Sequence, residues 1–284
     1  MLENVTAAFV GSGTMAEAMI KVMLDRKLIS PPAIIASGPR LERGEALAAR
    51  YGVRGTTDNV AAASAADIVV LSVKPQVMPS VLAELRNKIL PHAVVLSIVA
   101  GVPVATLNRG LNHRAVVRAM PNTPAQIGEG MTVWIASAEV SEAQRKQVEA
   151  ILQAMGQEVY VDEEIQLDMA TAVSGTGPTY VFLVMEAMID AAVHLGFSRR
   201  VAKQLVLQTM RGSVLFAARS DKHLAELRNM VTSPGGTSAD AVYQLEKGSL
   251  RTVLSKAIWA AYQKSRLLAS MATVPNGPER EALG

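Results

Sequence analysis

One polar turn interrupts a long run of helical sequence in the second half of the chain, and its residue types suit anion binding. Residues 231–238 read Val-Thr-Ser-Pro-Gly-Gly-Thr-Ser, with apolar residues spaced by three and four on both sides, which predicts two flanking helices. Pro234 lacks an N–H, and Gly235 and Gly236 permit positive φ. Ser238 suits the N-cap of the second helix, whose positive end helps these amides to converge on one anion. A plain corner between two helices is the alternative interpretation.

A second group of small residues follows the first apolar run of the chain. Residues 7–10 predict a buried strand, after which Gly11 and Gly13 open a segment with helical apolar spacing. Ala16 stands where the dinucleotide-binding fingerprint has its third glycine, and alanine still lets helix and strand approach each other. In this strand–turn–helix context, the glycine turn predicts dinucleotide binding.

The end of the second predicted strand bears on which dinucleotide binds. NAD sites usually place a carboxylate there, whereas this chain has Ser37, Gly38, Pro39 and Arg40. A hydroxyl and a guanidinium suit a 2′-phosphate, so NADPH is the favoured cofactor and NADH is an alternative. Arg40 could equally be a solvated residue at a helix start.

Polar or glycine-rich segments also follow three later strands. Lys74 and Pro75 follow the strand of residues 68–73, and Ala100 follows the next strand. Asn122 and Thr123 come after residues 116–119 and could face a nicotinamide carboxamide or simply fold the turn. Open α/β sheets bind ligands at these carboxyl ends of strands, so we expect cofactor contacts here.

The periodicity of the chain changes once, near residue 162. Before it, continuous apolar runs alternate with helical stretches, which predicts a parallel sheet covered on both faces. The expected strands cover residues 7–10, 33–36, 68–73, 94–98, 116–119, 131–135 and 158–161, and a helix is expected over 141–155. Beyond it, helices are expected over residues 168–174, 180–195, 201–219, 223–231, 239–247 and 250–269.

This pattern predicts an α/β fold with an N-terminal Rossmann-type dinucleotide-binding domain followed by an all-α domain. The expected domains are residues 1–162 and 163–272, and residues 273–284 form a polar tail. Residues 180–195 are apolar on more than one face, which indicates a helix buried against a partner chain as well as within its own. We therefore expect an obligate dimer.

Composition narrows the classes of function. The 284 residues include no cysteine, so disulfides, thiolate metal sites and cysteine nucleophiles are excluded, and a reducing cytoplasm is expected. The 28 cationic residues nearly balance the 25 acidic ones and form no cluster, so nucleic-acid binding is not indicated. Residues 93–107 are apolar but too short to span a bilayer, and no signal peptide is evident, so no membrane association is expected.

The motifs together resemble the pyrroline-5-carboxylate reductase family, over about residues 6–268. The segments that carry the resemblance are GSGTMAEAM, ADIVVLSVKPQ, SIVAG, VRAMPNTPA, SGTGPTYVFLVMEAMIDAAVHLGF and VTSPGGTS. The resemblance implies a Rossmann domain and a helical dimerisation domain, assembled as a homodimer or a higher oligomer such as a decamer. It also implies reduction of the C=N bond of 1-pyrroline-5-carboxylate by NAD(P)H to give L-proline, the last step of proline biosynthesis.

The resemblance further implies a set of cofactor contacts. The phosphates would lie against Gly11, Ser12, Gly13, Thr14 and Met15. Adenosine and its 2′-phosphate would lie against Ser37 and Asn59. The nicotinamide side would contact Val73, Lys74, Pro75, Ala100, Asn122 and Thr123.

The substrate carboxylate would bind at the turn of residues 231–238. By resemblance its ligands are Ser233, Gly235, Gly236 and the amides of Thr237 and Ser238. The Ser238 hydroxyl would lie beside the imine nitrogen, which makes Ser238 the expected catalytic residue. Relatives usually have Thr at that position, and Thr176 and Thr179 replace the usual Ser and Ala.

Two other functions would make different demands on the sequence. A β-hydroxyacid dehydrogenase would need a catalytic lysine in the helical half, where Lys203 is the nearest candidate. A non-enzymatic NADP sensor would be expected to lose the hydroxyls or glycines of residues 233–238, and all are present. The four histidines lack metal-ligand spacing, so no metal site is expected. Glu163, Glu164 and Asp168 are interpreted as a solvated helix start, and the two tryptophans as core or interface residues.

Overall fold

The computed structural model describes residue 2 and residues 4–273 and divides the chain into two compact units. Unit 1 runs to Thr176 and takes in the segment that begins at Ala261, and unit 2 is Gly177–Ala260. The division differs from the predicted boundary at residue 162, because residues 163–176 and the end of the last helix pack with the first unit. The predicted tail lies outside the described residues, except for Thr273, which ends a helix.

Unit 1 is built on one eight-stranded sheet in the order β3-β2-β1-β4-β5-β6-β7-β8. Its strands are β1 (Ala7–Val10), β2 (Ile34–Ser37), β3 (Arg54–Thr56), β4 (Ile68–Leu71), β5 (Val94–Ser97), β6 (Val116–Met120), β7 (Gly130–Ala136) and β8 (Gly156–Tyr160). The first six pair in parallel, as predicted. β7 pairs antiparallel with β6, which the prediction of a parallel sheet missed. The connection between them is too short for the crossover that a parallel pair requires.

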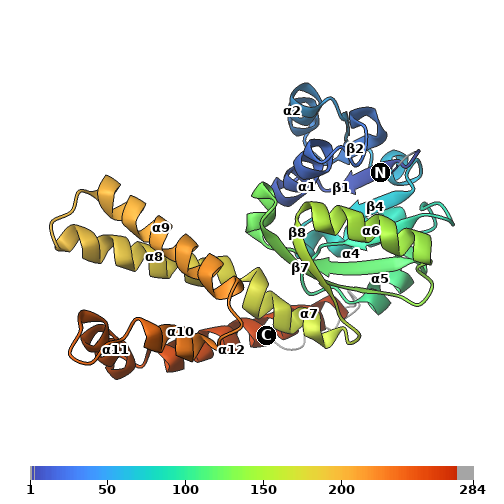
Figure 1. The fold of residues 1–284 in the computed structure, drawn as a ribbon. Helices are drawn as coiled ribbons and strands as arrows, with labels where there is room; N and C mark the ends of the chain where they lie inside the picture. The colour runs from blue at the N-terminus through green and yellow to red at the C-terminus, as the bar shows by residue number, and fades with distance from the viewer. Residues whose placement is uncertain (1, 3, 274–284) are drawn as a thin grey trace, which may run out of the picture. The chain divides into compact units, whose positions relative to one another are not determined.

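Helices cover both faces of this sheet, and two hydrophobic cores result (Figure 1). The helices of the unit are α1 (Thr14–Asp25), α2 (Leu41–Tyr51), α3 (Asn59–Ala63), α4 (Met78–Leu85), α5 (Val104–Leu111), α6 (Glu142–Ala154) and α7 (Ile165–Ala170). Shorter turns are η1 (Pro31–Ala33), η2 (Pro75–Val77), η3 (Thr123–Ile127) and the π-helix η4 (Thr171–Gly175).

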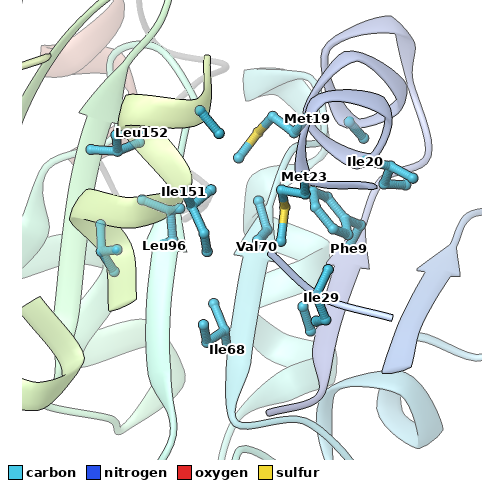
Figure 2. Packing of buried hydrophobic residues seen from close by; sticks show 14 of the residues in the cluster. Phe9, Met19, Ile20, Met23, Ile29, Ile68, Val70, Leu96, Ile151 and Leu152 are labelled. Atoms are coloured by element: carbon cyan, nitrogen blue, oxygen red, sulfur yellow. The ribbon is translucent and has the colours of Figure 1, made fainter. Parts of the chain in front are cut away.

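The larger core lies between the sheet, α1 and α6. Figure 2 shows Met19 and Met23 of α1 close to Phe9 and Val70 of the strands, with Ile151 of α6 nearby. These side chains are fully buried, and each aliphatic or aromatic side chain buried in this way contributes about 1.5–3 kcal/mol. This core fixes the positions of the strands and therefore of their carboxyl ends.

Unit 2 consists of helices. They are α8 (Gly177–His194), α9 (Arg199–Ala218), α10 (Leu224–Met230), α11 (Thr237–Lys247) and the first part of α12 (Leu250–Thr273). α8 and α9 pack against each other, and Arg199 Nη2 donates to Asp190 Oδ1 at 2.8 Å near the turn that joins them. The predicted helices are therefore confirmed, with ends that differ by a few residues.

Many apolar side chains of unit 2 are exposed in the single chain. Phe182 and Leu183 of α8 are 60% and 65% exposed, and Phe216 of α9 is 57% exposed. The helical stretch Ile165–His194 is long and apolar enough to cross a membrane by length and composition alone, and 6% of its most apolar window is buried. Exposed apolar surface of this extent is typical of sites that interact with another protein or with a membrane.

Candidate functional site

The glycine turn of unit 1 has the backbone geometry that the sequence predicts. Gly11 has φ +101°, and a Cβ there would lie 2.7 Å from the backbone nitrogen of Val73, so only glycine fits. The Gly11 N–H donates to the Ser37 carbonyl at 2.9 Å, and the Ser72 hydroxyl donates to the Gly11 carbonyl at 2.7 Å. The turn is therefore fastened to the ends of β2 and β4.

The first turn of α1 leaves backbone donors available beside this glycine turn. Gly13 is the N-cap, and no side chain caps the helix. The N–H groups of Thr14 and Met15 lie in the first turn, where an α-helix provides no acceptor for them. Ala16 is fully buried, in keeping with its place at the third position of the fingerprint. A helix N-terminus of this kind binds phosphate groups through its amides and its dipole.

A pocket of about 490 Å³ opens beside the glycine turn. Its lining residues are Ser12, Gly13, Thr14, Glu17, Arg40, Glu42, Arg43 and Ala46. Arg40, which the sequence suggests for the 2′-phosphate, is the N-cap of α2 and lines the same pocket as the glycine turn. The pocket therefore brings together the glycine turn and the start of α2, two of the segments that the sequence predicts to contact a dinucleotide.

Ser37 and Asn59 are hydrogen-bonded to each other, which the sequence did not indicate. Ser37 is fully buried, and its hydroxyl donates to Asn59 Oδ1 at 2.5 Å. Asn59 Nδ2 donates to Glu84 Oε2 at 2.9 Å. In this structure the Ser37 hydroxyl supports the end of β2, and its direct contact with a 2′-phosphate stays a prediction.

The segments after β4 and β5 lie at the carboxyl edge of the sheet. Lys74 is exposed and precedes Pro75, the first residue of η2, while Val73 is partly exposed beside Gly11. Ala100 is partly exposed and precedes Gly101, whose φ of +72° disfavours other residues and where a Cβ would lie 3.1 Å from Leu268 Cβ. This edge is where the sequence placed the nicotinamide contacts.

Asn122 uses its amide within the fold. Its Oδ1 accepts from the Met131 N–H at 3.0 Å, and its Nδ2 donates to the Ser174 carbonyl at 3.0 Å. Of the two roles that the sequence left open, the structure shows the one that folds the turn. Thr123 begins η3 and is exposed.

In unit 2 the turn of residues 231–238 joins α10 to α11. Gly235 has φ +70°, and the Gly236 N–H donates to the Ser233 carbonyl at 3.0 Å. The Gly236 amide therefore closes the turn in this structure, and its donation to an anion stays a prediction. The amides of Thr237 and Ser238 lie in the first turn of α11 and have no helical acceptor.

The predicted capping role of Ser238 is wrong. The N-cap of α11 is Gly236, with extended backbone, and Ser238 is the second residue of the helix. Its side chain is partly exposed, and its hydroxyl has no hydrogen-bond partner within the part of the chain that the structure describes. One hydroxyl therefore does not have to cap the helix and serve a ligand at once.

Sequence reasoning missed a charged network in unit 1. Arg118, in β6, is 3% exposed and contacts Glu164 Oε1 at 2.9 Å and Asp168 Oδ1 at 3.1 Å. Glu164 also accepts from the Val104 N–H, and Asp168 accepts from the Ser265 hydroxyl. The solvated helix start that we expected for Glu164 and Asp168 is wrong. An arginine within an apolar strand was the signal, because a buried cation needs an anionic partner.

A second cluster that the sequence did not indicate surrounds Glu17 of α1. Arg43 Nη2 and Arg50 Nη1 contact its two carboxylate oxygens at 2.5 and 3.0 Å, and the Tyr51 hydroxyl donates to it at 2.9 Å. The hydrogen bond from Arg43 is the largest influence on the pKa of Glu17 and lowers it from its usual 4.5. Burial, followed by the bond to Glu17, raises the pKa of Tyr51 above 10.0.

The remaining titratable residues show no arrangement for metal binding. Within residues 2 and 4–273, no group of three His, Cys, Asp or Glu side chains could hold an ion. His113 is buried with Nε2 2.8 Å from the Ala93 carbonyl, and His223 caps α10. Trp134 is in the core as expected, and Lys203 is exposed on α9.

Two family models each match one part of the chain. Residues 164–268 match the model of the pyrroline-5-carboxylate reductase dimerisation domain. Residues 6–101 match the model described as NADP oxidoreductase, coenzyme F420-dependent.

Full-length relatives and solved structures agree with these matches. The pyrroline-5-carboxylate reductase of Pseudomonas aeruginosa is 41% identical over 92% of this chain and 96% of its own. That of Synechocystis is 38% identical over 93% of this chain and 98% of its own. The Plasmodium falciparum pyrroline carboxylate reductase with NADP bound has a TM-score of 0.87 and 32% identity, covering 94% of this chain and 99% of that one. The Coxiella burnetii enzyme has a TM-score of 0.85 and 34% identity over 94% and 99% of the two chains. The predicted fold class is confirmed, and the chain belongs to the pyrroline-5-carboxylate reductase family.

Proposed function

We propose that the protein reduces the C=N bond of 1-pyrroline-5-carboxylate with NADPH and releases L-proline, completing proline biosynthesis. The observation that carries this proposal is the open turn of residues 233–238, which presents hydroxyls and unbonded helix amides in unit 2. The glycine turn and the pocket of unit 1 support it, as does membership of the pyrroline-5-carboxylate reductase family. NADH remains an alternative cofactor.

Different residues of unit 1 would contact different parts of the cofactor. Gly11, Ser12, Gly13, Thr14 and Met15 would hold the phosphates through backbone amides. Arg40, with Ser37 and Asn59 behind it, would favour the 2′-phosphate by charge. The nicotinamide side would be held by Val73, Lys74, Pro75, Ala100, Asn122 and Thr123. When bound, the reduced nicotinamide supplies the hydride that adds to the imine carbon.

The residues of unit 2 act on the substrate. The Ser233 hydroxyl and the amides of Gly235, Thr237 and Ser238 would bind the carboxylate, and the tight Gly236 would keep a side chain out of that space. A protonated imine already accepts hydride well, so no strong acid is needed. The free Ser238 hydroxyl would orient the N–H of the imine, and holding reactants in place can lower a barrier by several kcal/mol.

Two serine variants test the role of Ser238. Ser238→Ala should lower kcat about 100-fold, the usual effect of removing one donor from a reacting group. Ser238→Thr should remain active because it keeps the hydroxyl. The exposed Ser255 of α12 provides a matched control, Ser255→Ala, which should behave as the wild type. Full activity of Ser238→Ala would contradict the proposed role.

A bulky residue at the turn tests the substrate site as a whole. Gly236→Trp should block the carboxylate site while NADPH still binds, as followed by its fluorescence. Turnover should be measured with pyrroline-5-carboxylate, pyrroline-2-carboxylate and piperideine-6-carboxylate side by side. Wild-type turnover of pyrroline-5-carboxylate by this variant would rule out the assignment of the turn.

We further propose that the protein is a cytoplasmic homo-oligomer, either a dimer or a higher assembly such as a decamer. The match to a dimerisation domain and the exposed apolar side chains of α8 and α9 support an oligomer, and the absence of cysteine from the sequence fits a reducing compartment. Light scattering on the purified protein measures the assembly directly. A monodisperse monomer of 30.1 kDa would contradict it.

A further inference from the structure

Arg43 is a residue of α2 that reaches back to the glycine turn. Its Nε donates to the Ser12 carbonyl at 2.8 Å, and its Nη2 donates to Glu17 Oε2 at 2.5 Å. One guanidinium thus ties α2 both to the turn before α1 and to the first turn of α1. The side chains of Arg43 and Glu17 are only 27% and 20% exposed, so the ion pair is partly shielded from solvent.

The contacts around Arg43 fix its orientation. Glu17 holds Arg43 with one carboxylate oxygen, and its other oxygen is engaged by Arg50 and Tyr51. A guanidinium has a rigid planar fork, so fixing Nη2 at Glu17 also fixes the direction of Nε toward Ser12. Arg43 is therefore oriented before any ligand arrives.

The bond to the Ser12 carbonyl has a consequence for the next residue. The peptide unit between Ser12 and Gly13 is planar and trans, so its N–H points opposite to its C=O. By holding the Ser12 carbonyl toward α2, Arg43 fixes the direction of the Gly13 N–H. Gly38 also packs closely against this turn, because a Cβ at Gly38 would lie 2.5 Å from the Ser12 hydroxyl oxygen.

We propose that Arg43 is a positioning residue that orients the phosphate-binding turn rather than a ligand of the 2′-phosphate. Arg43 lines the same pocket as Arg40, but its donors Nε and Nη2 are already directed at Ser12 and Glu17. The inference rests on the proposed cofactor site. It assigns different tasks to Arg40, the N-cap of α2, and to Arg43, within α2. Arg40 distinguishes NADPH from NADH, and Arg43 serves both cofactors equally.

Binding measurements with both cofactors test this division. Dissociation constants for NADPH and NADH are measured on the full-length protein by nucleotide fluorescence, together with kcat and KM. Arg43→Ala should raise Kd for both cofactors about tenfold, with the ratio of the two constants unchanged within about twofold and the kinetic loss in KM rather than kcat. Arg40→Ala, the matched control, should raise Kd for NADPH alone. Glu17→Gln should give a smaller loss for both cofactors, because it removes the charge that orients Arg43.

Several outcomes would overturn the inference. If Arg43→Ala weakens the binding of NADPH alone, Arg43 is a 2′-phosphate ligand. If the variant lowers the melting temperature but leaves the dissociation constants of both cofactors unchanged, the role of Arg43 is only structural. Arg43→Lys keeps the charge but cannot make both contacts, so it should show the same parallel loss even if the alanine variant does not fold. Gly11→Ala separates the two proposals, since wild-type binding of both cofactors by that variant would reject the cofactor site itself.

Discussion

Removing Arg118 should destabilise unit 1 strongly, because its partner Asp168 would be left buried without a cation. Arg118 is 3% exposed and Asp168 is 6% exposed, and they are joined at 3.1 Å. The change Arg118→Met keeps most of the apolar volume and removes the charge. Glu164, whose side chain is 32% exposed, can be hydrated after the change. Asp168 would retain, among the residues that the structure describes, only the side-chain hydrogen bond from the Ser265 hydroxyl.

The expected loss of stability follows from this difference in exposure between Glu164 and Asp168. Breaking a buried ion pair by removing one partner costs about 3–5 kcal/mol. The remaining bond from Ser265 and the partial exposure of Glu164 place the expected cost near the lower limit, at about 3 kcal/mol. Asp168→Asn should cost less, about 1–2 kcal/mol, because Arg118 keeps Glu164. Arg118→Met combined with Asp168→Leu removes both charges and should come within about 1 kcal/mol of the wild type.

Urea unfolding measures these differences. Trp134 is fully buried in unit 1 and reports its unfolding by fluorescence, and a Trp259→Phe background removes the signal of the tryptophan in unit 2. The free energies of the wild type, Arg118→Met, Asp168→Leu and the variant that combines these two changes form a double-mutant cycle. A cost below about 1 kcal/mol for Arg118→Met, or a double variant as unstable as the sum of the single ones, would refute the reasoning.

Three further changes have expected outcomes. Because the pKa of Glu17 is lowered in the folded state, its contribution to stability is present above its usual pKa of 4.5 and is lost as the pH falls through the lower, folded-state value. Glu17→Gln should therefore lower the melting temperature at pH 7 and have a smaller effect in acid. A difference in melting temperature that is the same at all pH values would contradict this. Gly156→Ala should cost about 3 kcal/mol or more, because Gly156 has φ +139° and a Cβ there would overlap the Gly130 carbonyl oxygen; a wild-type urea midpoint would disprove the clash. Thr176→Ala should cost about 1 kcal/mol of stability in the same assay, because it loses the 2.8 Å hydrogen bond from the Thr176 hydroxyl to the Thr171 carbonyl. Thr176→Ser keeps the hydroxyl and should cost little. Equal losses in both variants would rule out the hydroxyl as the cause.

Segments with strong local patterns were predictable from the sequence. Residues 7–10 followed by Gly11 and Gly13 predicted the strand, turn and helix that the structure shows, because a buried apolar run and a glycine requirement are both local properties. The strand β3 was missed: Arg54, Gly55 and Thr56 carry no apolar pattern. That strand forms through tertiary contact, since Gly44 of α2 approaches Gly55 so closely that a Cβ on Gly55 would lie 2.6 Å from the Gly44 oxygen.

Orientation and pairing were harder to predict than the elements themselves. An apolar run such as β7 has the same pattern in either direction, and only the short connection through Thr123–Ile127 indicated the antiparallel pair. The partners of Arg118 lie 46 and 50 residues away, beyond the reach of local periodicity. The cap of α11 was misplaced because serine is the commoner N-cap, although Gly236 can fill that position as well.

The bond between Ser265 and Asp168 joins residues 97 positions apart and so sets an order of events during synthesis. The chain emerges from the ribosome N-terminus first, so the sheet, Arg118 and Asp168 are available before Ser265 has been made. The whole of Gly177–Ala260 must be translated before the segment that begins at Ala261 can dock against unit 1. In the nascent chain the Arg118–Asp168 pair must therefore form before the Ser265 hydroxyl is available. Until then, the surface of unit 1 against which the segment that begins at Ala261 docks stays exposed to solvent and to chaperones.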